Sequence, residues 1–192
     1  MNTQELFDNA QDRYVYAREL VTRMVDFATQ SNIEVNLKDA YDQLDIVVQY
    51  ILLKIAVADG KFLEIEGEFM DNITDSYDLL YLFDSYYDTD YDWSFVGAYL
   101  NFEHVIFLLD KIDQLAIGHI RAFSDLFAEI DMLDSSVNYG KELYECIRDI
   151  ALAFIMCDGN AADRELKIAV DVVSEYLTTP WLINKHKRKN QS

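Results

Sequence analysis

Two short acidic segments contain the side chains in this chain that are best suited to binding a cation. They repeat at an offset of 99 residues, from Asp59 to Asp158. Their acidic residues are Asp59, Glu64, Glu66, Asp158, Asp163 and Glu165. Closely spaced carboxylates are the oxygen ligands that hard divalent cations such as Ca²⁺ and Mg²⁺ prefer. The spacing predicts a cation site in each segment, completed by backbone carbonyls left free at a helix end.

The same acids also permit a structural interpretation. Gly60 and Gly159 follow the first Asp of each segment, and glycine can adopt the left-handed conformation that ends many helices. The later acids would then open the next helix, where free N–H groups and the helix dipole stabilise negative charge. In that interpretation they cap helices and solvate the surface. An EF-hand is excluded, because its alternating Asp/Asn ligands and its Glu at position 12 are missing.

Helices with matching apolar patterns flank both turns. Before the turns, the corresponding apolar residues are Leu44, Val48, Ile51 and Ile55 in the first copy and Leu143, Ile147, Ile150 and Phe154 in the second. After the turns, Phe69 and Ile73 correspond to Ile168 and Val172. Spacings of three and four residues are typical of amphipathic helices. The sequence therefore predicts two helix–turn–helix units, at about residues 37–77 and 136–176.

This pattern resembles the TerB-like family, which includes tellurite-resistance TerB and related bacterial stress-response domains. The resemblance is carried by Ala58-Asp59-Gly60-Lys61-Phe62 with Glu66, and by Asp158-Gly159 with Glu165. It implies an all-α domain with pseudo-twofold character whose acids form a patch for a divalent metal or a protein partner, often near membrane components. Two departures are Cys157, where the family has a small residue, and an acidic, aromatic insertion at about 77–99.

The resemblance implies a TerB-like bundle of about seven to eight helices, and the rest of the sequence pattern predicts a single all-α domain over residues 1–180. One proline and six glycines leave long stretches without helix breakers. Periodicity predicts helices at 3–30, 102–133 and 162–177. Asn36 is the expected cap of the second helix, Ser135 or Ser136 that of the helix ending at Cys157, and Gly118 is a point where the helix over 102–133 would soften or break.

A second candidate site is the stretch from Phe62 to Asp110, which contains no Lys or Arg. Its predicted partner-binding residues are Asp84, Tyr87, Asp88, Asp90, Tyr91 and Asp92. Acidic residues interleaved with tyrosines suit docking of a basic partner. In the extreme case they would imitate the phosphates of nucleic acid and compete with it for a nucleic-acid-binding protein. The alternative is a solvated acidic face over an aromatic core.

The charge and the termini limit the partners and the location. The formal net charge is −19, and becomes −19 − 4 = −23 without the four cations of residues 185–192. Such a body repels nucleic acid, so direct nucleic-acid binding is not expected. The charge favours a basic protein partner, and the resemblance implies that the partner is membrane-associated. Residues 181–192 are predicted to be a disordered basic tail.

Without a signal-like N-terminus or a long apolar run, we expect a cytoplasmic protein with no transmembrane segment. In such a protein, Cys146 and Cys157 are expected to stay reduced in the core.

Enzyme chemistry finds little support in the residues. His-Glu-x-x-His, Cys-x-x-Cys and Gly-rich phosphate-loop motifs are absent from the sequence. A di-metal helical bundle needs Glu-x-x-His on two helices, and the chain has none. The sequence therefore favours a non-enzymatic protein over a paired-carboxylate enzyme.

Overall fold

The computed structural model describes residues 2–58, 60, 63–74, 102–133, 138–159 and 163–173. Every regular element in these ranges is a helix, which confirms the all-α prediction. The helices are α1 (Thr3–Gln30), α2 (Leu37–Ala56), α3 (Glu64–Ile73), α5 (Phe102–Leu133), α6 (Tyr139–Met156) and α7 (Asp163–Val173). The predicted insertion at 77–99 and the predicted tail at 181–192 lie outside the described residues, and the count of seven to eight helices stays a prediction.

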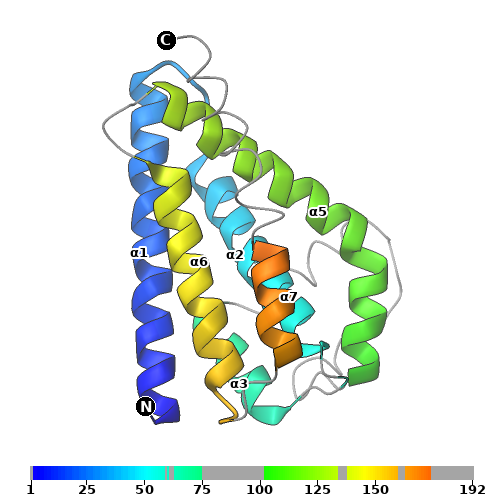
Figure 1. Cartoon of the computed structure of the whole chain (residues 1–192). Coiled ribbons are helices and arrows are strands. Elements are labelled where there is room, and N and C mark those ends of the chain that lie inside the picture. The colour runs from blue at the N-terminus through cyan, green and yellow to red at the C-terminus, as the bar shows by residue number, and fades with distance from the viewer. Residues whose placement is uncertain are drawn as a thin grey trace.

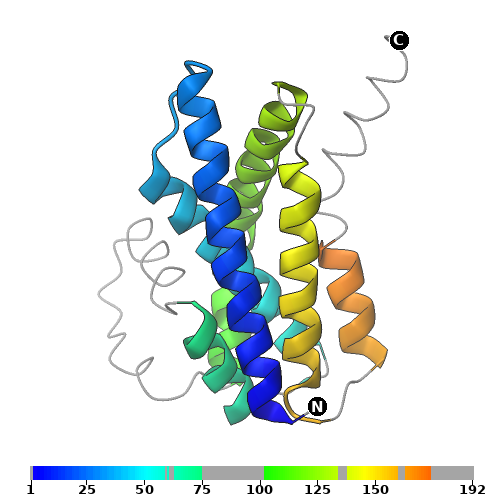
Figure 2. The same ribbon diagram turned by 90° about the vertical axis from the view of Figure 1, so that its left-hand side faces the viewer.

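Helix α2 is the centre of the bundle. It contacts α1, α3, α5, α6 and α7, and each of its residues from Leu44 to Leu53 is buried. A helical segment that is buried on all sides needs neighbours on all sides. On one side of it, α1 and α6 run antiparallel and side by side in both views, while α5 and α7 cover other sides (Figures 1 and 2).

Asparagine side chains fix the start of three helices. Asn2 accepts from the Glu5 N–H at 2.9 Å, and Glu5 accepts from the Asn2 N–H at 3.0 Å in return. Asn36 accepts from the N–H groups of Lys38 and Asp39, as predicted. The predicted cap of α6 was wrong, because α6 begins at Tyr139 with Asn138 as its cap. Capping removes the cost of leaving the first N–H groups of a helix without acceptors.

A buried carboxylate from another helix explains this start of α6. Asp131 near the end of α5 accepts from the N–H groups of Tyr139 at 2.7 Å and Gly140 at 3.0 Å. It lies in the core at 6% exposure, where a carboxylate needs such donors. The expected break at Gly118 is also absent, since α5 continues through it between the buried residues Ala116 and Ile120.

The two glycine turns have the predicted left-handed conformation. Gly60 has φ of 86° and Gly159 has φ of 78°. The Gly60 N–H donates to the Val57 carbonyl at 3.2 Å, and the Gly159 N–H donates to the Met156 carbonyl at 3.1 Å. The helices that follow begin at Glu64 and Asp163, again 99 positions apart. The turn geometry is therefore repeated locally, while a pseudo-twofold relation between whole halves stays a prediction.

Alanine at either turn glycine is expected to destabilise the fold by about 1–2 kcal/mol, because a Cβ disfavours the left-handed conformation. Neither site lacks space, since no atom lies within 4 Å of the added Cβ. The matched control is Gly118→Ala, which is equally open but helical and should stabilise by about 0.5–1 kcal/mol. Urea denaturation of the three variants measures the difference. Equal effects at all three glycines would contradict the assignment.

Candidate functional site

The two acidic turns, far apart in sequence, lie at the same end of the bundle, together with the start of α1 (Figures 1 and 2). We call this the turn end, formed by residues 2–8, 54–58, 60, 63–74, 154–159 and 163–167. The Thr3 hydroxyl donates to the Cys157 carbonyl at 3.5 Å, which joins the start of α1 to the end of α6. The antiparallel arrangement of α1 and α6 thus places the second turn beside the N-terminus of α1.

Three phenylalanines hold the first turn in place. Phe69 of α3 packs edge-on against Phe7 of α1, with ring centroids 5.0 Å apart, and against Phe154 of α6 at 5.4 Å. Phe69 is fully buried. Edge-to-face rings stabilise a contact beyond the area they bury. The short helix α3, which carries Glu64 and Glu66, therefore packs against both α1 and α6.

Glu66 caps the helix that it belongs to. Its carboxylate accepts from the Leu63 N–H at 2.6 Å, and the side chain is only 6% exposed. It is the third residue of α3, where a Glu reaching back to the cap residue is half of a capping box. The structural interpretation of the acidic turn is thus confirmed for Glu66, whose charge also benefits from the dipole of α3.

The other predicted ligands are described to different extents. Glu64 is exposed at the first position of α3, and Asp158 is exposed just after α6. Asp163 and Glu165 occupy the first and third positions of α7, but their side chains are outside the description, as is all of Asp59. Among the side chains that are described, no group of three His, Cys, Asp or Glu is close enough together to hold a metal ion.

The turn end has an acidic surface. Six of its described acids have exposed side chains: Glu5, Asp8, Glu64, Glu68, Asp71 and Asp158. Among its described basic residues, Lys167 is exposed and Lys54 is partly buried. An excess of carboxylates on one surface attracts cations and basic groups, most strongly at low salt. The second predicted site, Asp84, Tyr87, Asp88, Asp90, Tyr91 and Asp92, lies outside the described residues.

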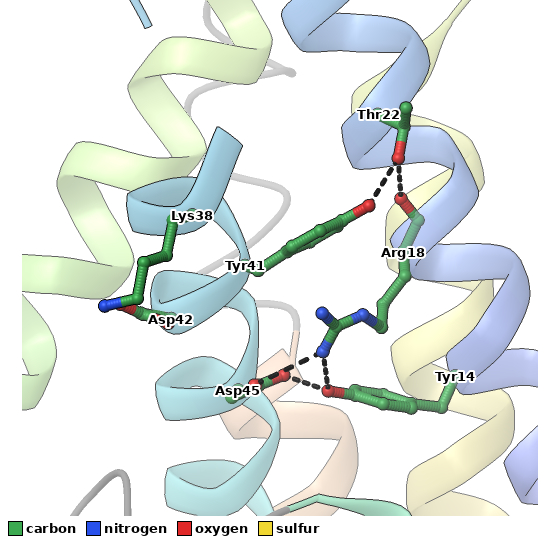
Figure 3. Close-up of polar contacts among 7 residues, drawn as sticks. All are labelled: Tyr14, Arg18, Thr22, Lys38, Tyr41, Asp42 and Asp45. Atoms are coloured by element: carbon green, nitrogen blue, oxygen red, sulfur yellow. Dashed lines mark hydrogen bonds and ion pairs between the residues drawn. The ribbon is translucent and has the colours of Figure 1, made fainter. Parts of the chain in front are cut away.

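A polar cluster between α1 and α2 was not predicted (Figure 3). We call Tyr14, Arg18, Thr22, Tyr41 and Asp45 the α1–α2 polar cluster. The Tyr14 hydroxyl donates to the Asp45 carboxylate. An Arg18 Nη1 donates to the Tyr14 oxygen at 3.1 Å and lies 3.6 Å from Asp45 Oδ2. The buried carboxylate of α2 is thereby matched by a hydroxyl and a positive charge from α1.

The outer part of the cluster is held by an aromatic ring. The Arg18 guanidinium lies 3.9 Å from the centre of the Tyr41 ring, a cation–π contact. The Thr22 hydroxyl donates to the Arg18 carbonyl at 3.0 Å and is 2.6 Å from the Tyr41 hydroxyl. Because a hydroxyl has one proton, Tyr41 is the donor to Thr22.

The electrostatics of this cluster suit a structural role. Burial raises the pKa of Tyr14, and the hydrogen bond to Asp45 and its negative charge raise that pKa further, while Arg18 lowers it. Tyr14 thus keeps its proton at neutral pH and serves as a donor. Asp45 in an otherwise apolar segment was the available signal, because a buried carboxylate requires partners on a neighbouring helix.

Polar contacts also join α1 to α6. The Tyr16 hydroxyl donates to Glu142 at 2.7 Å, which raises the pKa of Tyr16, and Arg13 lies 3.1 Å from Asp149. Beside them, Cys146 is a buried free thiol whose pKa is raised to about 11 by burial. Cys157 is buried as well, which confirms the prediction that both cysteines lie in the core.

Among the helices of the described residues, none combines the length and the apolar character needed to cross a bilayer. Comparison with protein-family models, with curated proteins and with solved structures finds no match to this chain.

Proposed function

We propose that this chain is a TerB-like, non-enzymatic, acidic stress-response protein that binds a divalent cation at its duplicated turns and offers the turn end to a protein partner. The observation that supports the proposal most is the position of the turns. Two acidic segments with the same glycine conformation, φ 86° and 78°, are brought to one end of the bundle.

The acidic surface of the turn end would supply the affinity for a cation. Glu64 is exposed in the first turn and Asp158 is exposed in the second, and a surface with an excess of carboxylates attracts cations. Ca²⁺ takes six to eight oxygen ligands and Mg²⁺ six, so the ion would draw on Asp59 with Glu64, or on Asp158 with Asp163 and Glu165, plus carbonyls and water. Glu66, fixed as a cap, would position the first turn of α3.

Titration with Ca²⁺ and with Mg²⁺ tests the cation. We expect heat of binding at two sites, and a free energy of unfolding that rises by about 2.7 kcal/mol per site at a hundred times the dissociation constant. Asp59→Asn and Asp158→Asn should each leave one site, and the double variant none. Isothermal calorimetry and thermal unfolding give both quantities.

The control keeps the net charge of the double variant and changes a different surface. Asp12→Asn with Asp26→Asn removes two exposed carboxylates of α1. This control should bind both ions as the unmodified protein does. Absence of heat and of any thermal stabilisation in the unmodified protein would remove the cation from the proposal. If both double variants lost the same amount of cation binding, the binding would be general charge screening and not a property of the two turns.

The second candidate function is docking of a basic partner through residues 62–110. Its support is the absence of Lys and Arg from that stretch, together with exposed Glu64, Glu68 and Asp71 on the part of it that forms α3. Long-range attraction of this kind raises the association rate and weakens with salt.

Alanine at Asp84, Asp88, Asp90 and Asp92 should abolish recovery of a basic partner in a pull-down at low salt. A variant with alanine at Asp12, Glu19, Asp26 and Glu34, which are exposed acids of the α1 region, loses the same charge and should retain the partner. If the partner binds nucleic acid, added nucleic acid should compete with the unmodified protein. Unchanged recovery with the first variant would end this candidate.

A further inference from the structure

We draw no further inference here: the strongest candidate, the exposed apolar side chains of Leu152 and Met156 on α6 and of Leu166 and Val170 on α7, carries nothing because the structure does not show what covers them.

Discussion

Replacing Phe69 with alanine is expected to lower the free energy of unfolding by about 3–5 kcal/mol, the cost of removing a fully buried aromatic ring. The ring contacts Phe7 and Phe154 at once, so its loss leaves a cavity where three helices meet. Phe69→Leu keeps most of the apolar volume and should cost about 1.5 kcal/mol. Urea denaturation followed by circular dichroism measures both. A cost below about 1 kcal/mol for the alanine variant would contradict this packing.

The same substitution separates the first turn from the second. Helix α3 has ten residues, which is too short to be stable without tertiary packing. Once Phe69 is lost, α3 should detach and take Glu64 and Glu66 with it. If the proposed function is right, Phe69→Ala then removes one of the two cation sites. The number of cations bound per chain, measured by calorimetry under conditions where the bundle remains folded, gives this result.

Phe123→Ala is the matched control for this effect. Phe123 of α5 is also fully buried and packs edge-on against Phe127 at 4.8 Å. Its loss should destabilise by a similar amount and leave both cation sites occupied. If both variants lost the same cation site, the loss would follow from lower stability and not from the detachment of α3.

Local patterns predicted most of the helices and both turns. The apolar spacing from Leu6 to Phe27 predicted α1, and the Asp-Gly pairs predicted left-handed glycines, because both signals depend on neighbours in the chain. The cap of α6 failed for the opposite reason. Its start depends on Asp131, a residue of a different helix, and no local pattern contains that information. Gly118 likewise stays helical because tertiary packing outweighs its low propensity.

The candidate site was predictable in its parts and not in its assembly. The capping role of Glu66 follows from its position at the start of α3. That both turns meet at one end depends on how α1, α2 and α6 pack, which is decided by contacts far apart in the chain. The pairing of Asp45 with Tyr14 and Arg18 could not be predicted for the same reason, because such a prediction requires knowing that α1 crosses α2 at that level.

Alanine at Asp45 is expected to destabilise the protein by about 2–4 kcal/mol. Its side chain is 9% exposed, and its removal leaves the buried Tyr14 hydroxyl and the Arg18 charge without this acceptor. Arg18 is 37% exposed, so water recovers part of the loss. Asp42→Ala, one turn earlier in α2, breaks only the exposed pair with Lys38 and should cost below about 0.5 kcal/mol (Figure 3).

Alkaline pH tests whether Tyr14 is held as a buried donor. Its pKa is raised in the folded protein, by burial first and by Asp45 second, so the stabilisation is complete below the unfolded pKa of about 10 and is lost as pH rises above it. Phenylalanine does not titrate. The stability advantage of the unmodified protein over Tyr14→Phe should therefore shrink by about 1.4 kcal/mol between pH 8 and pH 11. An advantage independent of pH would mean that the Tyr14 hydroxyl ionises as readily in the folded chain as in the unfolded one, and then Asp45 could not be its acceptor.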